Sequence, residues 1–233
     1  MFLSACRDSV FTPVNRLLAC RGAAVAPGES SMMLAPSLAL IVALGDSITY
    51  GYGLASPPMQ NYAALYAHRA HAKIVDLAVP GYQCDEVVRD EIPKMPRGAS
   101  TVILNCGTND IGGFSFTTDD KPDGTHRTAP ANDAEIAAAE RTFARALALI
   151  RAREPRAKIV LIGVRSWQRM TGPPSPQFAR DVAVWNAMLR ATGLPVVDLI
   201  RDPRMYARAY FQPDLLHPNV AGNAAIASDF PRP

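Results

Sequence analysis

The chain has 233 residues, which is long enough for one sizeable α/β domain and too short for two domains with a linker. Hydrophobic residues make up 48% and charged residues 19%, which excludes a disordered chain and is typical of a globular protein with a core. The formal charge of +3 comes from 24 basic and 21 acidic residues without a long run of either sign. Nothing in it predicts nucleic-acid binding or a basic membrane patch.

The first 36 residues differ from the rest of the chain. They show neither the alternation of a strand nor the stripe of a helix, so we expect a poorly ordered N-terminal extension over 1–36 and one domain over 37–233. Met32 or Met33 is an alternative start of translation. No stretch reaches the ~18 apolar residues of a membrane span, which predicts no stable membrane insertion. We expect the cytoplasm as the compartment, with secretion or the periplasm as the alternative.

From Leu38 onward, short apolar runs alternate with longer segments that have helical signals. The apolar runs are typical of strands buried on both faces of a sheet. The clearest helix has apolar residues at Ile136, Phe143, Leu147 and Ile150 and is followed by a proline. In chain order we predict strand 40–44, helix 61–72, strand 73–78, helix 85–92, strand 101–105, helix 133–153, strand 158–162, helix 177–192, strand 195–198 and helix 220–228.

This alternation predicts an α/β fold with one parallel five-stranded sheet covered by helices on both faces, which is a three-layer α/β/α sandwich. In open sheets of this kind, ligands bind beyond the carboxyl ends of the strands. Ser47, Gly81 and Asn109 all follow predicted strand ends. One edge of the sheet can therefore present them together.

Ser47 follows the first predicted strand, in Gly45-Asp46-Ser47. Its hydroxyl would lie at the rim of the sheet and its backbone N–H can face a substrate oxygen, which suits a nucleophile that also contributes to an oxyanion hole. The alternative is an ordinary polar turn after a strand. The α/β-hydrolase pattern Gly-x-Ser-x-Gly is not met, because Thr49 stands at its second glycine.

His217 stands three residues after Asp214. One turn can bring the carboxylate back to Nδ1 of the imidazole and leave Nε2 free to take the proton of a serine. The alternative is a plain turn before a helix, with Asp214 and Asn219 as turn formers. The other histidines are expected on the surface, with a metal pair at the first two as a remote alternative: His68, His71 and His126.

Asn109, in Gly107-Thr108-Asn109-Asp110, carries an amide that can donate to an oxyanion without titrating. Gly81 lets the backbone approach a ligand closely and can supply a second N–H group. The alternatives are an asparagine in a tight turn and an ordinary Pro-Gly turn.

The remaining candidates are cysteines and aromatic residues. Cys84 and Cys106 lie in strand-rich regions, and we expect buried thiols, because the spacing of the four cysteines fits neither a metal site nor a dense disulfide framework. Residues that could line a substrate pocket, or belong to the core instead, are Phe114, Phe116, Trp167, Met170 and Trp185.

Four sequence blocks resemble those of the SGNH hydrolase superfamily, the GDSL-type esterases and lipases. They occur in the family's order over about 38–228: Gly45-Asp46-Ser47, Gly81, Gly107-Thr108-Asn109-Asp110 and Asp214-Leu215-Leu216-His217-Pro218. The resemblance implies a flavodoxin-like sandwich, a nucleophilic Ser47 and the pair Asp214/His217. It also implies an oxyanion hole made of the N–H groups of Ser47 and Gly81 and the side chain of Asn109. Ile48 replaces the leucine of the family name.

These residues together predict a serine esterase that hydrolyses carboxylic esters through an acyl-enzyme on Ser47. We expect short acyl groups, because no long apolar lid segment is visible. The alternatives are a thioesterase or lysophospholipase-like enzyme, a carbohydrate acetyl-transfer enzyme and, from another class, a catalytically silent module that binds glycans or lipids. The chemistry requires no metal and no cofactor. The expected partner is a small-molecule, glycan or lipid ester, and the oligomeric state is not predicted.

Overall fold

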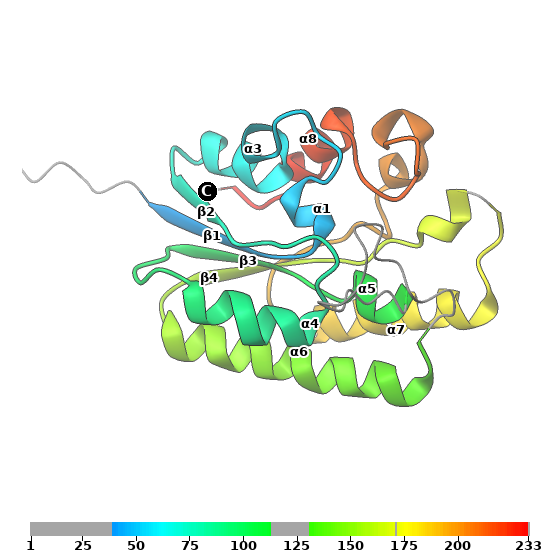
Figure 1. The fold of residues 1–233 in the computed structure, drawn as a ribbon, viewed down its shortest axis with the longest axis horizontal. Coiled ribbons are helices and arrows are strands. Elements are labelled where there is room, and N and C mark those ends of the chain that lie inside the picture. The colour runs from blue at the N-terminus through cyan, green and yellow to red at the C-terminus, as the bar shows by residue number, and fades with distance from the viewer. Residues whose placement is uncertain (1–38, 113–130, 171, 233) are drawn as a thin grey trace, which may run out of the picture. The chain divides into compact units, whose positions relative to one another are not determined.

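A computed structural model describes residues 39–112, 131–170 and 172–232. The expected extension over 1–36 lies outside these ranges, as do Phe114, Phe116 and His126. Within them, the chain forms one five-stranded sheet with helices on both faces (Figure 1). The strands are all parallel and lie in the order β2-β1-β3-β4-β5. The predicted α/β fold is therefore confirmed.

The strands follow the predicted apolar runs closely. The central strands are fully buried at nearly every position, because helices cover both of their faces. Gly45 of β1 pairs with Asn105 of β3, so these two strands end at the same level. The five strands are β1 (Leu40–Gly45), β2 (Lys73–Asp76), β3 (Thr101–Asn105), β4 (Lys158–Ile162) and β5 (Val196–Val197).

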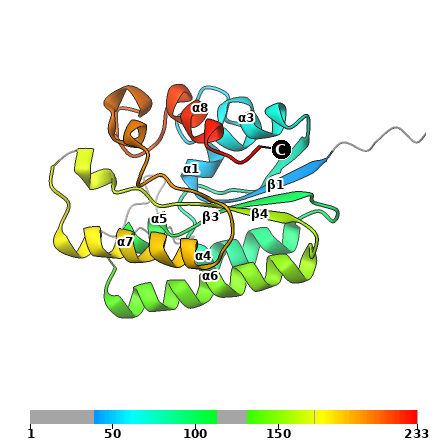
Figure 2. The same ribbon diagram turned by 180° about the vertical axis from the view of Figure 1, so that it is seen from behind.

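The helices form two layers, which Figure 1 and the reverse view in Figure 2 both show. The layer on one face contains α1 (Ser47–Tyr50), α3 (Tyr62–Arg69) and α8 (Val220–Ser228). The other contains α4 (Cys84–Glu86), α5 (Thr108–Gly112), α6 (Asp133–Arg153) and α7 (Pro176–Ala191). The remaining helical turns are α2 (Pro57–Gln60), a π turn (Val87–Glu91) and the 3-10 turns Ile92–Lys94, Trp167–Met170, Pro203–Tyr206 and Arg208–Tyr210.

Successive side chains of each strand point to opposite faces of the sheet and pack into two separate hydrophobic cores. Val42 and Leu44 of β1 pack into the core under α6 and α7, whereas Ile41 and Ala43 pack into the core under α3 and α8. A strand with apolar residues at every position is stable only between two such layers. This is why the apolar runs predicted the sandwich. Among the described residues, no helix is both long and apolar enough to cross a membrane.

The prediction that Cys84 and Cys106 are free thiols was wrong. Both are buried, but they form a disulfide with Cα atoms 5.2 Å apart, a separation typical of such bonds. They are 22 residues apart in the chain. No short sequence pattern indicates that the start of α4 lies against the end of β3.

Candidate active site

Ser47 is the first residue of α1, two positions beyond the end of β1. The preceding Asp46 caps this turn, since its Oδ1 accepts a hydrogen bond from the backbone N–H of Ile48 at 2.9 Å. Asn105, at the end of β3, donates to the same oxygen at 3.2 Å. Burial raises the pKa of Asp46 to about 7, and the hydrogen bond from Ile48 opposes this rise. The position of Ser47 is thereby fixed to the ends of both central strands.

The structure brings Ser47, His217 and Asp214 into one chain of hydrogen bonds. Nε2 of His217 lies 2.9 Å from Oγ of Ser47, and Nδ1 of His217 lies 2.7 Å from Oδ2 of Asp214. Oδ1 of Asp214 accepts the backbone N–H of His217 at 3.0 Å. This is the geometry in which a carboxylate orients an imidazole that removes a serine proton.

The carboxylate of Asp214 is suited to stay ionised. Partial burial works to raise its pKa, but hydrogen bonds from the ring and backbone of His217 and from the backbone of Leu216 outweigh it, so the pKa is lowered. Asn219 caps α8, with its Oδ1 accepting from the N–H of Gly222 at 3.0 Å. The two interpretations of this segment are therefore compatible. Asn219 caps a helix, and Asp214 pairs with His217.

Arg165 supports the loop that carries Asp214 and His217, and no sequence motif indicates this role. Its guanidinium donates to the carbonyl oxygens of Leu215 and Leu216, the latter at 3.0 Å. Its Cζ atom also lies 3.9 Å from the centroid of the Phe211 ring. Arg165 is only 6% exposed, and burial lowers its pKa to about 10. An isolated arginine after a strand has no distinctive sequence pattern, so only the fold identifies its role.

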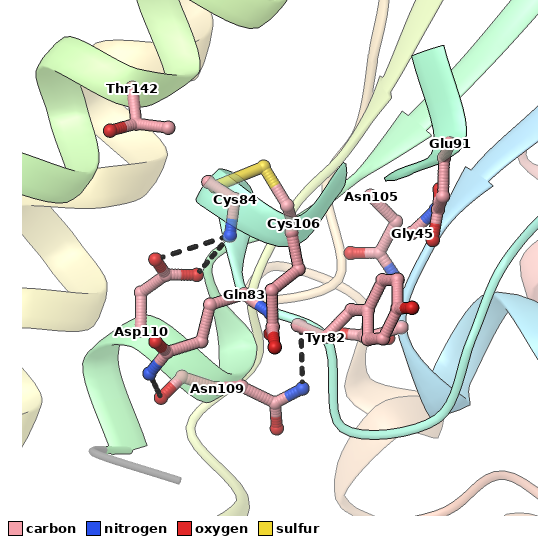
Figure 3. The surroundings of a disulfide bond; sticks show 12 residues. Gly45, Tyr82, Gln83, Cys84, Glu91, Asn105, Cys106, Asn109, Asp110 and Thr142 are labelled. Carbon is pink, nitrogen blue, oxygen red and sulfur yellow. Dashed lines mark hydrogen bonds between the residues drawn. A yellow bond between two sulfur atoms is a disulfide. The ribbon is translucent and has the colours of Figure 1, made fainter. Parts of the chain in front are cut away.

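The predicted oxyanion-hole residues Gly81 and Asn109 lie on adjacent segments. Nδ2 of Asn109 donates to the carbonyl oxygen of Tyr82, next to Gly81, at 2.8 Å (Figure 3). The amide nitrogen carries two hydrogens, and this bond uses one of them. Gly81 has a φ of +88°, which side chains other than glycine rarely tolerate. Val79 donates to the carbonyl of Gly45 at 3.0 Å, so this segment follows the end of β1.

Gly107 allows the Asn109 segment to turn sharply over the core. Its φ is +116°, and an added Cβ would lie 2.3 Å from the ring of Trp185. Trp185 is fully buried and packs edge-on against Phe143. Of the two roles considered for Trp185, pocket wall or core, the structure assigns it to the core.

A small cavity lies next to the segments that carry Ser47, Asn109 and His217. Its lining includes the residues next to Ser47, Asn109 and His217 in the chain. They are Ile48, Thr108, Leu216 and Pro218, together with Arg165 and Trp167. Trp167 therefore remains a candidate for substrate contact. Met170 is half-buried, with its sulfur 2.9 Å from the guanidinium of Arg165.

Glu91 is a second buried group that the sequence did not indicate. Its Oε2 accepts the backbone N–H of Gly45 at 2.8 Å, directly behind the Ser47 turn. Burial raises the pKa of Glu91 to about 9, so the protonated form is favoured near neutral pH. Burial also raises the pKa of two other carboxyls, to about 7 for Asp110 and about 6 for Asp76.

The predicted surface histidines His68 and His71 are exposed on and just after α3. In the part of the chain that the structure describes, no group of three or more His, Cys, Asp or Glu residues could hold a metal ion.

Solved structures with the same fold include several lipolytic enzymes. A lipase, Lip_vut3, from a goat rumen metagenome has a TM-score of 0.61 at 17% identity, over 82% of this chain and 95% of its own. Phospholipase A1 from Streptomyces albidoflavus has a TM-score of 0.59 at 17% identity, over 81% and 95%. The psychrotrophic esterase EstA from Pseudoalteromonas sp. has a TM-score of 0.56 at 16% identity, over 82% and 93%. No curated protein sequence matches this chain.

At these identities the structural likeness shows the fold alone. The sequence model of the GDSL-like Lipase/Acylhydrolase family matches residues 43–225, which include all four motifs and most of the domain. The chain therefore belongs to the GDSL-like lipase/acylhydrolase family, the SGNH hydrolases.

Proposed function

We propose that this protein is a serine esterase that hydrolyses short-acyl carboxylic esters through an acyl-enzyme on Ser47. The observation that carries the proposal is the pair of contacts made by His217, 2.9 Å to Oγ of Ser47 and 2.7 Å to Asp214. A binding module would need neither the base nor the carboxylate that orients it.

The reaction proceeds in two steps. His217 removes the proton of Ser47, and the serine oxygen attacks the ester carbonyl to form a tetrahedral oxyanion. The backbone N–H groups of Ser47 and Gly81 and the side chain of Asn109 donate to that oxyanion. The alcohol then leaves with the proton from His217, and water hydrolyses the acyl-enzyme by the same route.

The preference for short acyl groups is supported by the small size of the cavity that Ile48, Thr108 and Leu216 line, since these residues are chain neighbours of Ser47, Asn109 and His217. An ester panel with a constant alcohol and acyl chains from two to sixteen carbons tests this preference. We expect kcat/KM to be highest for the shortest chains, and a maximum at long chains would overturn it.

The nucleophile is tested with a fluorophosphonate probe and tandem mass spectrometry. We expect one stoichiometric adduct on Ser47, and neither an adduct nor turnover in the Ser47→Ala variant. Ser166, a buried serine four residues after the end of β4, provides the matched control, since Ser166→Ala should keep the adduct. An unlabelled Ser47 in a folded protein would support the silent binding module instead. Competing alcohols and thioesters in the same assay distinguish hydrolysis from acyl transfer and thioesterase activity.

The compartment is a separate proposal. A disulfide persists in oxidising surroundings and is rare in the cytosol of mesophiles. The Cys84–Cys106 bond therefore supports the alternative from the sequence, the periplasm or the outside of the cell, over the cytoplasm. Fractionation of the producing cells tests this proposal, and protein found only in the cytosolic fraction would reject it.

A further inference from the structure

The two segments that carry the predicted oxyanion donors Gly81 and Asn109 are joined by the only disulfide in the described part of the chain. Cys84 stands three residues after Gly81, and Cys106 stands three residues before Asn109. Figure 3 shows the sulfur–sulfur bond between Cys84 and Cys106, with Asp110 hydrogen-bonded to the backbone of Cys84 and Asn109 hydrogen-bonded to Tyr82 and Gln83. The disulfide thus connects the Gly81 segment to the Asn109 segment by a short covalent path, with three residues from each donor to its cysteine.

The two cysteines join the start of one regular element to the end of another. Cys106 directly continues β3, which pairs with β1 on one side and β4 on the other. Cys84 begins α4, a single turn of three residues that follows the left-handed Gly81. The π turn Val87–Glu91 and the 3-10 turn Ile92–Lys94 continue it without a break, and this helical segment packs against α6. The disulfide therefore ties the start of this helical segment, three residues after Gly81, to the end of the central strand of the sheet.

Hydrogen bonds between the two segments are few, and most are long. Apart from the 2.8 Å bond from Asn109 to Tyr82, Gln83 donates to the carbonyl of Asn109 at 3.4 Å. The backbone N–H of Cys84 donates to the carboxylate of Asp110 at 3.2 and 3.3 Å. Hydrogen bonds of this length lie at or beyond the upper end of the usual range. The covalent bond is the strongest connection between the segments.

We propose that the Cys84–Cys106 disulfide positions the oxyanion hole, and that these two cysteines are positioning residues for the Gly81 N–H and the Asn109 amide. The inference rests on the proposed esterase function. Catalytic donors must be held within about 0.5 Å of their productive places. Loss of the link lets the Gly81 segment move relative to Asn109, which weakens binding of the oxyanion and leaves binding of the ground-state ester almost unchanged.

The test compares the double variant Cys84→Ala/Cys106→Ala with wild type. The matched control is Cys6→Ala/Cys20→Ala, which removes the other two cysteines of the chain. We expect the first variant to lose about 10- to 100-fold in kcat, which is less than the ~10²–10³ for removing a donor outright. KM should stay within about twofold, and a trifluoromethyl ketone that mimics the tetrahedral intermediate should lose the same factor in affinity. The control variant should match wild type in all three.

A purely structural disulfide would behave differently. Its removal would lower the unfolding midpoint, because it closes a loop between residues 22 positions apart. It would leave kcat and the affinity for the ketone unchanged at temperatures well below that midpoint. This result, or free thiols at Cys84 and Cys106 in active wild-type protein by mass spectrometry, would overturn the inference.

A second measurement covers the case in which the double variant does not fold. Folded wild type is treated with dithiothreitol under mild warming. The reagent transfers two electrons and two protons to the disulfide, which becomes two thiols. The reagent itself is oxidised to a cyclic disulfide. Alkylated protein with both thiols blocked should show the same fall in kcat. Wild type without turnover or label on Ser47 would reject the proposed function itself, whereas an active protein insensitive to loss of the disulfide would reject only this inference.

Discussion

The guanidinium of Arg165 donates to the backbone carbonyl of Leu216 at 3.0 Å, one residue before the histidine that contacts Ser47. It also bonds the carbonyls of Leu215 and Met205. Leu215 has a φ of +58°, which is uncommon for a residue with a side chain. Arg165 is thus the buried cation that satisfies the backbone of a loop in an unfavourable conformation.

Arg165→Lys is expected to lower kcat about tenfold or more. A lysine carries one compact ammonium group and cannot reproduce the planar fork that binds several carbonyls at once. The steady-state kinetics of the variant check this, together with Arg169→Lys as the control, because Arg169 is exposed and lies over the ring of Tyr206. An Arg165→Lys enzyme with kcat within twofold of wild type would contradict the role of this side chain.

Asp214→Asn is expected to lower kcat by about 10²–10⁴ with little change in stability. The amide oxygen can still accept the backbone N–H groups of Leu216 and His217, but the amide no longer supplies the negative charge that stabilises the protonated imidazole. Burst kinetics and thermal unfolding measure the two effects separately. Asp133→Asn, at an exposed carboxylate paired with Arg180, is the control. Equal turnover in both variants would rule out the carboxylate as the group that orients His217.

Asn109→Ala is expected to lower kcat about 10²- to 10³-fold while KM changes little. The lost donor acts on the tetrahedral intermediate more than on the bound ester. Asn132→Ala serves for comparison, because Asn132 caps α6 and should affect stability without affecting turnover. The assignment fails if the Asn109 variant raises KM and keeps kcat, since that pattern belongs to ordinary substrate binding.

Glu91→Gln is expected to stabilise the protein increasingly as pH rises. The pKa of Glu91 is raised from 4.5 to about 9 in the folded chain. The folded state therefore keeps a proton that the unfolded state releases, so the free energy of unfolding contributed by Glu91 falls as pH rises from about 4.5 and levels off above about 9. Glutamine is a neutral isostere that does not ionise, so this fall in the free energy of unfolding is absent from the variant. Its side-chain oxygen can still accept the hydrogen bond from the backbone N–H of Gly45.

Denaturant unfolding at pH 5, 7 and 9 checks this expectation. The difference in unfolding free energy between Glu91→Gln and wild type should be smallest at pH 5 and largest at pH 9. A difference between Glu91→Gln and wild type that stays constant across these pH values would show that Glu91 titrates alike in both states.

Features with a local sequence pattern were predicted well. The helix predicted over 133–153 has those same bounds in the structure, because its apolar spacing and the asparagine cap at 132 act within the segment. The predicted helix over 85–92 is instead a single turn of α4 followed by a π turn. There the chain must direct Glu91 inward to Gly45, a tertiary contact between residues 46 positions apart.

The convergence of Ser47, Asp214 and His217 was predictable for the same reason. A hydroxyl, an imidazole with its carboxylate, and an amide stand in short motifs at strand ends, and a parallel sheet brings such ends together. Arg165 and the Cys84–Cys106 pair could not be predicted, because their partners are 50 and 22 residues away along the chain. Neither has a motif of its own, and only the packed fold identifies what they contact.

The acid and the base of the proposed triad share one short turn, with Asp214 and His217 bonded to each other within four residues. Assembly of the catalytic machinery thus depends on a single docking event, that of this turn against the serine. Heating should accordingly abolish turnover below the temperature of global unfolding, because the turn can separate from Ser47 while the sheet and its two cores remain folded. Loss of turnover at temperatures where far-ultraviolet circular dichroism is still native would be the sign of such early undocking.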